Sequence, residues 1–396
     1  MNIGMILDNS FPPDPRVENE ASTLIGAGHK VYLYCFDHTH DQPVTEEING
    51  IVVHRYRTPE WYSKASALAY TVPLYHYHIK KSIRNFIRKY AIEALHVHDM
   101  QVARAVFQLN ESFQLPVVLD LHENRPEIMK FYPHVRSLIG RLTIFPEIWK
   151  KFEAKYMKKA THTVVVTEEA KQHYVNQFRV SPGKIRVVPN TVRKSFYTNY
   201  QVFNDITSAY RNNFTILYVG ETGLRRGLLT LLAAVTHLVN AIPHLKVVIV
   251  GKSRTDHVLR NYVEQYDLHN YVDLEGWQHF ERFPSYIMAS NVCVCPIHRN
   301  IHHDTTFANK LFQYVSLEKP VVVSNCTAQE NFVNEHECGL VFRDRDEQEL
   351  ASHIRYLHDH PDEAGRLGRN GKQAVKAFYN WEYTSRSLTT LYNNLI

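Results

Sequence analysis

Short apolar runs alternate with longer segments of helical periodicity along the whole chain. Runs that are apolar on both faces, with helical segments between them, are typical of parallel sheets covered by helices on both sides. Two successive series of such runs predict an α/β fold made of two doubly wound, Rossmann-like domains. The first series is NIGMIL, KVYLYCF, IVVHRYR, ALHVHD, PVVLDLH, HTVVVT and IRVVP, and the second is FTILYVG, LKVVIVG, YVDLEG, NVCVCPI, PVVVS and CGLVF.

A polar stretch without clear periodicity, VPNTVRKSFYTNYQVFND, separates the two series. We therefore predict an N-terminal domain over residues 1–193 and a C-terminal domain over residues 194–379. Local signals agree with the predicted elements. In DPRVENEASTLIGAG, Asp14 can cap a helix, Pro15 suits its first position, and the glycines can end it.

The composition is that of a globular protein. A chain of 396 residues with 44% hydrophobic and 21% charged residues can form two cores, which excludes a disordered chain. Five cysteines without framework spacing indicate reduced thiols and a cytoplasmic protein. Cys293 and Cys295 alternate in a strand-like run, which favours core positions over a metal site. Neither a signal peptide nor an apolar run of about 18 residues is visible, so no membrane span is predicted.

The net charge is +5, and the basic excess lies in the N-terminal half. Residues 79–90 combine basic side chains with apolar residues at helical spacing, and residues 147–159 are lysine-rich with aromatic residues nearby. A basic amphipathic helix is typical of contact with an anionic membrane surface. The alternatives are apolar stripes that pack on the sheet beneath a solvated face, and a soluble acidic acceptor.

Polar groups follow several of the predicted strands directly. In doubly wound sheets, ligands bind beyond the carboxyl ends of the strands. Because both domains carry such groups, we predict a ligand held in a cleft between the domains. The candidates are His98 and Asp99 after ALHV, His122 and Glu123 after VVLDL, Glu221 to Arg226 after ILYVG, Lys252 and Ser253 after VVIVG, and Thr305 to Lys310 after CVCPI.

Two of these groups place cations at the start of a helix. Arg225 and Arg226 precede GLLTLLAAV, and Lys310 lies at the helix start in TTFANKLF. Helix N-terminal amides, the positive end of the helix dipole and a guanidinium together make an anion site. Two cationic helix starts in one domain suit a diphosphate. The alternative is a pair of solvated arginines in a turn.

His122 lies at a strand end, where an imidazole can bind a polar substrate or transfer a proton. The alternative is a structural histidine. Glu123 and Glu127 follow it, although carboxylates are common at helix starts. Asp344 and Asp346 match an Asp-x-Asp pattern, but they precede a helical segment, so we interpret them as capping residues and predict no metal site.

An ordered set of motifs resembles a known family over almost the whole chain. FPPDPRVENEASTLIGAGHKV, HVHDM, LDLHENRPE, VVVTEEAKQHY and KIRVVPNTV resemble the N-terminal half of retaining glycosyltransferases of family four, the group 1 glycosyltransferases of bacterial surface-polysaccharide type. ILYVGETGLRRGL, VVIVG, DLEGW, ANKLFQYVSLEKPVV and GLVF resemble the donor half. The resemblance implies the GT-B fold, with a closing helix at about 380–396 that crosses back to the first domain.

The resemblance also implies roles for individual residues. Arg226 stands where a basic residue contacts the donor diphosphate, Lys310 beside the loop that cradles donor sugar and phosphate, and His122 near the transferred sugar. Further donor contacts are implied for Gly220, Glu221, Arg225, Lys252, Thr305, Thr306, Asn309 and Gln313, and acceptor-side contacts for Asp14, Arg16, His98, Asp99 and Glu123.

Three residues depart from the family pattern. Thr305 and Gln313 stand where the family has a pair of glutamates, and Glu221 stands where many members have arginine. Gln313 keeps a carbonyl acceptor for a ribose hydroxyl but loses the strength of a charge-assisted hydrogen bond.

The function implied is transfer of a hexosyl-type sugar, with retention, from a nucleotide-diphosphate donor to a glycan or lipid-linked acceptor. No metal or cofactor is required, and no nucleic acid is involved. The expected location is the cytoplasm, in peripheral contact with the inner face of the cytoplasmic membrane. The alternatives are a nucleotide-sugar epimerase of similar architecture and a non-catalytic GT-B subunit that binds a partner transferase. An assay of sugar transfer from a nucleotide donor would distinguish a glycosyltransferase from both alternatives.

Overall fold

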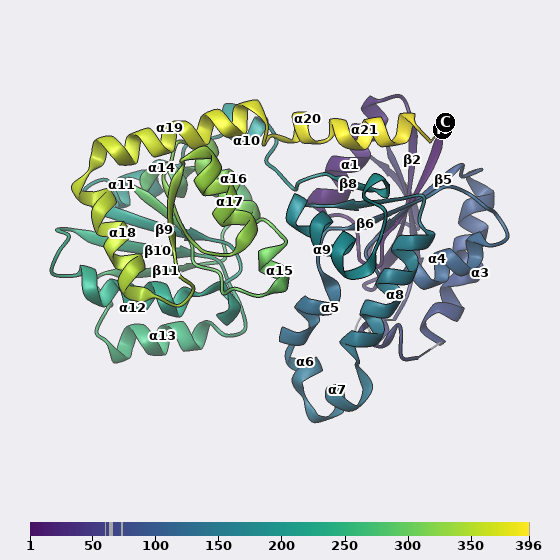
Figure 1. Cartoon of the computed structure of the whole chain (residues 1–396), viewed down its shortest axis with the longest axis horizontal. Coiled ribbons are helices and arrows are strands. Elements are labelled where there is room, and N and C mark those ends of the chain that lie inside the picture. The colour runs from purple at the N-terminus through teal and green to yellow at the C-terminus, as the bar shows by residue number, and fades with distance from the viewer. Residues whose placement is uncertain (60, 63–65, 73, 396) are drawn as a thin grey trace. The chain divides into compact units, whose positions relative to one another are not determined.

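The computed structural model describes residues 1–59, 61–62, 66–72 and 74–395. They form two compact units (Figure 1), each built on one sheet. The N-terminal unit comprises Met1–Asn190 and Ser385–Ile396, and the C-terminal unit comprises Thr191–Thr384. The sequence pattern placed the boundaries at 193/194 and at about 380. The predicted α/β class with two parallel-sheet, Rossmann-like domains is confirmed.

The N-terminal sheet has eight strands in the order β3-β4-β2-β1-β5-β6-β7-β8. β3 pairs antiparallel with β4, and the other neighbours pair in parallel. The apolar runs predict all of these strands except β3, whose TEEI sequence is half-exposed at the sheet edge. The strands are β1 (Asn2–Ile6), β2 (Lys30–Asp37), β3 (Thr45–Ile48), β4 (Ile51–Arg57), β5 (Ala94–His98), β6 (Val117–Leu121), β7 (His162–Val165) and β8 (Ile185–Val187).

The first helix of this unit begins as its sequence predicts. The Asp14 side chain accepts hydrogen bonds from the backbone N–H groups of Arg16 and Val17, and Pro15 occupies the first turn. The helical segments are α1 (Pro15–Gly26), η1 (Ser66–Leu68), α3 (Leu74–Lys89), α4 (Ala103–Asn110), α5 (Arg125–Ile128), η2 (Met129–Phe131), α6 (Pro133–Arg136), α7 (Leu138–Thr143), α8 (Pro146–Lys159), α9 (Glu168–Phe178), η3 (Pro182–Lys184) and α21 (Arg386–Asn393).

The apolar stripes of α3 and α8 pack in the core, which was the alternative to an apolar contact with a membrane. On α3, Ile79, Ile83 and Phe86 are at most 1% exposed, and on α8 Trp149 is fully buried. These side chains pack in the core of the N-terminal unit because burial there removes them from water completely. Residues 79–90 and 147–159 therefore offer a membrane only their charged faces. Among the described residues, no helix has the length and apolar character needed to cross a bilayer.

The C-terminal sheet has six parallel strands in the order β11-β10-β9-β12-β13-β14. Chain order reverses between β9 and β12, and ligands of doubly wound sheets bind at the carboxyl ends of the strands at such a reversal. Cys293 and Cys295 are fully buried in β12, as predicted for core positions. The strands are β9 (Phe214–Val219), β10 (Leu245–Val250), β11 (Val272–Gly276), β12 (Val292–Cys295), β13 (Val321–Ser324) and β14 (Gly339–Phe342).

Helices cover both faces of this sheet (Figure 1). α18 begins at a capped terminus, where the Asp346 side chain accepts a hydrogen bond from the Glu349 N–H at 2.9 Å. The capping interpretation is thus confirmed for Asp346 but wrong for Asp344, whose carboxylate accepts a hydrogen bond from Arg299 N at 3.1 Å and lies 2.8 Å from His298 Nδ1. The helical segments are α10 (Ser195–Thr198), α11 (Asn204–Ala209), η4 (Leu224–Arg226), α12 (Leu228–Leu238), α13 (Asp256–Gln265), η5 (Phe280–Arg282), α14 (Phe283–Ala289), α15 (Ile301–Asp304), α16 (Asn309–Ser316), α17 (Thr327–His336), α18 (Glu347–Asp359), α19 (Pro361–Ala377) and α20 (Trp381–Thr384).

Candidate functional site

The loop after β9 lies at the strand-order reversal of the C-terminal sheet. It begins with Gly220, whose φ of 120° lies in the region that favours glycine. A Cβ atom at Gly220 would come 2.9 Å from the Nζ atom of Lys310. The glycine therefore lets the β9 loop approach the first turn of α16, and two segments about ninety residues apart in sequence form one site.

Three cations and one carboxylate meet in this site. The Oε2 atom of Glu221 accepts hydrogen bonds from Arg226 Nε at 2.8 Å and from Arg225 Nη2 at 3.3 Å. Partial burial raises the pKa of Glu221, but the charge and hydrogen bond of Arg226, with Arg225 and Lys310, lower it below its usual value. The carboxylate is thus ionised at neutral pH and compensates part of the positive charge.

Lys310 is the most unusual member of this group. Its ammonium is buried and lies 3.5 Å from the centroid of the Tyr218 ring. Within the described residues, Nζ has no hydrogen-bond partner. Burial lowers the pKa of Lys310 well below its usual value, and the nearby charge of Arg226 lowers it further. A buried ammonium that contacts a π face but no acceptor is costly, so this position favours an incoming anion.

The other predicted donor residues fall into two groups. Thr305 and Thr306 donate their hydroxyl protons within one turn, to Ile301 O at 2.7 Å and His302 O at 2.8 Å respectively. The others make no such contact within the described part of the chain: Lys252 is exposed after β10, Asn309 is exposed as the first residue of α16, and Gln313 is half-buried one turn further into that helix.

In the N-terminal unit, a histidine–carboxylate pair follows β5 and β6. His122 Nε2 lies 3.3 Å from Asp99 Oδ2. Burial lowers the pKa of His122, but the charges of Asp99 and Asp120 outweigh that effect and raise it above its usual value. Burial also raises the pKa of Asp99. The imidazolium form of His122 is therefore favoured, and His122 can donate a hydrogen bond to a ligand.

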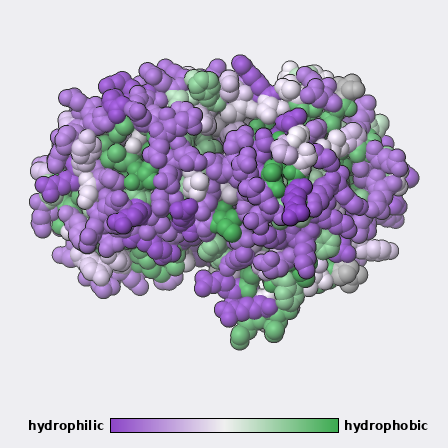
Figure 2. Space-filling model, in the orientation of Figure 1, coloured by the Kyte–Doolittle hydropathy of each residue, from purple (hydrophilic) through white to green (hydrophobic). Residues whose placement is uncertain are grey.

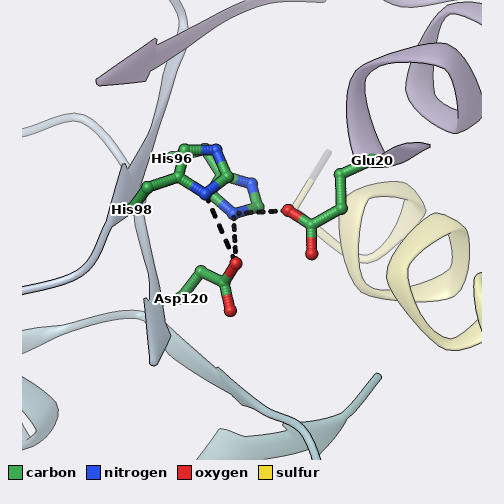
Figure 3. A group of neighbouring side chains, drawn as sticks. All are labelled: Glu20, His96, His98 and Asp120. Carbon is green, nitrogen blue, oxygen red and sulfur yellow. Dashed lines mark ion pairs between the residues drawn. The ribbon is translucent and has the colours of Figure 1, made fainter. Parts of the chain in front are cut away.

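Behind this pair lies a buried cluster that the sequence pattern did not predict as a whole (Figure 3). Arg16 Nε and Nη2 each donate to Asp120 at 2.8 Å, and Nη2 also lies 2.9 Å from Glu20 Oε1. His96 Nε2 lies 3.2 Å from Glu20 Oε2, and His98 Nδ1 lies 3.3 Å from Asp120 Oδ2. All five side chains are at most 4% exposed.

Glu20, His96, His98 and Asp120 place four potential metal-ligating atoms within 4.8 Å of one another. The Arg16 guanidinium lies against both carboxylates and already supplies a buried positive charge. Burial raises the pKa of Asp120, but Arg16 and the hydrogen bond from His98 hold it well below its usual value. The single charge of Arg16 therefore offsets part of the negative charge of the two carboxylates.

This cluster revises two acceptor-side predictions. Arg16 is 4% exposed and His98 is fully buried, and both contact Asp120. They support the strand ends that position His122 and Asp99, and their burial argues against direct acceptor contact. Asp14 acts as the α1 cap, while the Glu123 carboxylate lies 3.3 Å from Arg125.

One further acid, which is partly buried, interacts with the pair and was missed. Asp8, two residues after β1, has its pKa raised to about 7 by desolvation, with Arg125 lowering it and Asp99 raising it. An aspartate just after an apolar strand was the available signal, as it was for Asp99. Glu127 is mostly buried and forms an ion pair with Lys130 at 2.7 Å, which favours a structural role.

Two units, each built on a Rossmann-like sheet of mainly parallel strands, have the architecture of the GT-B class. Residues 16–196 match the family model described as Glycosyltransferase Family 4, and residues 213–360 match the model described as Glycosyl transferases group 1. The chain belongs to glycosyltransferase family four, and it is a glycosyltransferase.

Individual relatives agree with this assignment. The capsular polysaccharide biosynthesis glycosyltransferase CapM of Staphylococcus aureus is 23% identical over 351 residues, covering 81% of this chain and 90% of CapM. The sucrose-phosphate synthase of Thermosynechococcus elongatus superposes with a TM-score of 0.80 at 20% identity, covering 100% of this chain and 99% of the other. Anabaena Alr3699/HepE, solved in complex with UDP and glucose, has a TM-score of 0.74 at 14% identity and full coverage of both chains.

Proposed function

We propose that this glycosyltransferase moves a hexosyl-type sugar, with retention, from a nucleotide-diphosphate donor to a glycan or lipid-linked acceptor in cell-surface polysaccharide or glycolipid assembly. The observation that carries the donor assignment is the buried ammonium of Lys310 beside Arg226. The similarity to CapM supports the polysaccharide context, and the UDP complex of HepE supports a nucleotide sugar as donor.

In this proposal the leaving group receives most of the stabilisation. The bond between the anomeric carbon and the phosphate oxygen breaks, and the electron pair stays on the departing diphosphate. Arg226 of η4 and Lys310 of α16, which are close enough for their charges to interact, stabilise the charge that develops there. Charge-stabilising donors held in place before the reaction are usually the largest single contribution to catalysis.

The acceptor hydroxyl then bonds to the anomeric carbon on the face from which the diphosphate departs, which gives retention. Its proton passes to the departing phosphate oxygen, so atoms and charges balance without a protein nucleophile. In the N-terminal unit we assign to His122 a hydrogen bond to a sugar hydroxyl, supported by the charge that Asp99 favours on the imidazole. Gln313 is assigned to a ribose hydroxyl.

A lipid-linked acceptor places the enzyme at the inner face of the cytoplasmic membrane. The exposed basic faces of residues 79–90 and 147–159 support an electrostatic contribution there, since each lysine or arginine near an anionic surface contributes about 1 kcal/mol. Exposed members include Lys81, Arg84, Arg88, Lys151, Lys155, Lys158 and Lys159.

A screen of nucleotide sugars by thermal shift, followed by a transfer assay with the best binder, tests the proposed function. A ligand that binds only the native state raises the apparent melting temperature. The donor should raise it in the wild type and not in Arg226→Ala, whereas Arg369→Ala, an exposed residue of α19, should respond as the wild type does. A chain that responds to no nucleotide sugar would contradict the donor assignment.

A further inference from the structure

Two leucines project from the N-terminal unit on α7. Leu138 is 82% exposed and Leu142 is 76% exposed. Residues four apart in a helix share one face, so the two side chains form a common surface. Phe131 and Phe145, at either end of the α6–α7 segment, are each 40% exposed. Figure 2 shows apolar residues gathered at the protrusion that Figure 1 labels α7. We call Phe131, Leu138, Leu142 and Phe145 the apolar tip.

The exposed leucines belong to a well-built hairpin. Val135 and Ile144 are at most 8% exposed and pack in the unit's core. Ser137 caps α7 by accepting a hydrogen bond from Gly140 N at 3.0 Å, and it donates to His134 O at 2.7 Å. A Cβ atom at Gly140 would lie 1.9 Å from His134 O, so close contact of α6 and α7 requires glycine. The hairpin thus buries two apolar side chains while α7 presents two others to solvent.

The charges around the apolar tip are mostly positive, although the exposed Glu147 follows Phe145 by two residues. Arg136 and Arg141 are exposed on α6 and α7, and the chain has no aspartate or glutamate from residue 128 to residue 146. In α8, which follows, Glu153 is buried and its pKa is raised to about 8 by burial, so it adds little negative charge at neutral pH. A surface that combines apolar side chains with arginines matches the interface of an anionic bilayer.

We propose that the apolar tip inserts into the interfacial layer of an anionic membrane, with Arg136 and Arg141 contacting lipid phosphates. This deepens the proposed function, on whose lipid-linked acceptor it rests. The apolar faces of α3 and α8 are buried in the core, so the tip supplies the apolar contact that these helices do not. The positive charge around the tip is complementary to anionic lipid headgroups, so we assign a lipid surface as its partner. A protein partner would instead bind the tip in the absence of lipid.

Sedimentation of the full chain with vesicles tests this assignment. Vesicles of phosphatidylcholine alone are compared with vesicles that also contain phosphatidylglycerol. The wild type should bind the anionic vesicles, and the double variant Leu138→Ser/Leu142→Ser should bind at least about tenfold more weakly. Arg136→Gln/Arg141→Gln should weaken binding and reduce its salt dependence. Val202→Ser, which changes a side chain that is 41% exposed in the other unit, is the matched control.

Three results would overturn the assignment: no binding of the wild type at low salt, equal binding by the leucine double variant, or a leucine-dependent complex in solution without lipid. The last result would identify the tip as a protein interface. UDP binding by the double variant is measured in parallel. Unchanged nucleotide binding with lost vesicle binding separates the tip from the donor site, so either proposal can fail alone.

A second inference concerns Glu221, and it rests on the proposed donor site. Its carboxylate lies between the two guanidinium groups, and its Oε1 atom packs where a Cβ atom of Gly223 would be, 2.3 Å from that ideal position. Gly223 has φ −61° and ψ 152°, a conformation open to any residue. The glycine at this position therefore provides space for the carboxylate and is not required by the backbone.

We infer that Glu221 is an internal counter-ion that occupies the position of the donor diphosphate until the donor binds. An anion of higher charge must displace it to reach Arg225 and Arg226. Donor binding then includes the cost of breaking these hydrogen bonds, which lowers affinity. Glu221 acts through the two arginines and is a positioning residue.

Titration calorimetry with UDP and with pyrophosphate tests this role. Glu221→Gln removes the charge, while Gly223→Ala keeps it and displaces the carboxylate. Both should bind each ligand about tenfold more tightly than the wild type, and Glu264→Gln on α13 should not differ from it. Unchanged or weaker binding in Glu221→Gln would overturn the counter-ion role. If Arg226→Ala still abolished binding, the donor site would stand and only the counter-ion role would fail; absence of binding in every protein would overturn both.

Discussion

The two units use buried charge in opposite ways. In the N-terminal unit, the guanidinium of Arg16 contacts the carboxylates of Asp120 and Glu20, and all three side chains are nearly inaccessible to solvent. In the C-terminal unit, one partly exposed carboxylate, Glu221, faces three cations, and the ammonium of Lys310 is buried over an aromatic ring. In the N-terminal unit, buried groups of opposite charge pair with one another and stabilise the fold. In the C-terminal unit, positive charge is in excess and is available to an anionic ligand.

The largest effect is expected when one member of the buried cluster in the N-terminal unit is changed. Asp120→Asn leaves Arg16 buried with only Glu20 as a charged partner, so the free energy of unfolding should fall by about 3–5 kcal/mol. Urea unfolding measures the change. Glu111→Gln, which removes an exposed ion pair with Lys159 at 3.2 Å, is the control and should cost less than about 1 kcal/mol. A loss no larger than that of the control would show that the cluster is not a stabilising charge pair.

The next effect tests the excess cations. Arg226→Ala and Lys310→Ala should each lower sugar transfer by about 10²-fold, the scale for losing one charge-stabilising donor. Lys310→Met should also leave the free energy of unfolding unchanged or increased, because it removes a buried ammonium that lacks an acceptor. Loss of activity without loss of stability is the expected signature. Near-wild-type turnover in both alanine variants would contradict the assignment, with Lys376→Ala as the matched surface control.

A smaller effect sharpens the donor site. Gln313→Ala should weaken nucleotide-sugar binding by about 1–3 kcal/mol, because a ribose hydroxyl would lose its partner. Gln313→Glu should bind at least as tightly as the wild type, since it restores a charged acceptor. Calorimetry with the donor measures both. Equal affinity of the alanine variant and the wild type would remove Gln313 from the site.

The smallest effect is a pH dependence in the N-terminal unit. The folded pKa of His122 is raised above its unfolded value of about 6.5. The stability that His122 contributes is therefore fully present below about pH 6.5 and is lost as the pH rises through the folded pKa. The difference in unfolding free energy between the wild type and His122→Gln should shrink from pH 6 to pH 9. Asp99→Asn should flatten this profile, and a difference that grows with pH would contradict the charge pairing.

Sequence patterns predicted most of the sheet strands because buried parallel strands are apolar on both faces. They left open whether the apolar stripe of α3 faces the core or a membrane, because both kinds of stripe have the same periodicity and only the neighbouring elements distinguish them. The exposed surface formed by Leu138 and Leu142 of α7 was missed for the same reason. Two leucines in a short segment are expected to be core residues until the neighbouring elements are known.

The site was predicted unevenly. Arg226 and Lys310 follow strand ends, so topology alone indicated them, and the structure brings their loops together. Glu20 and Asp120 were missed, since charged residues are rarely buried unless paired and the pairing partner, Arg16, is distant from Asp120 in sequence. The aspartate inside the apolar run VVLDL was the available signal, because a fully buried strand position needs a partner for any charge it carries.

The last helix of the N-terminal unit has a consequence for how the chain is made. Tyr392 of α21 hydrogen-bonds to His96 Nδ1 at 2.9 Å, and Leu388 and Leu391 are fully buried against this unit. α21 is synthesised only after the whole C-terminal unit. During translation, the surface that α21 covers, next to the charge cluster, therefore stays exposed until the C-terminal unit has been synthesised. The C-terminal unit can be complete before the N-terminal unit is, although it comes second in the chain.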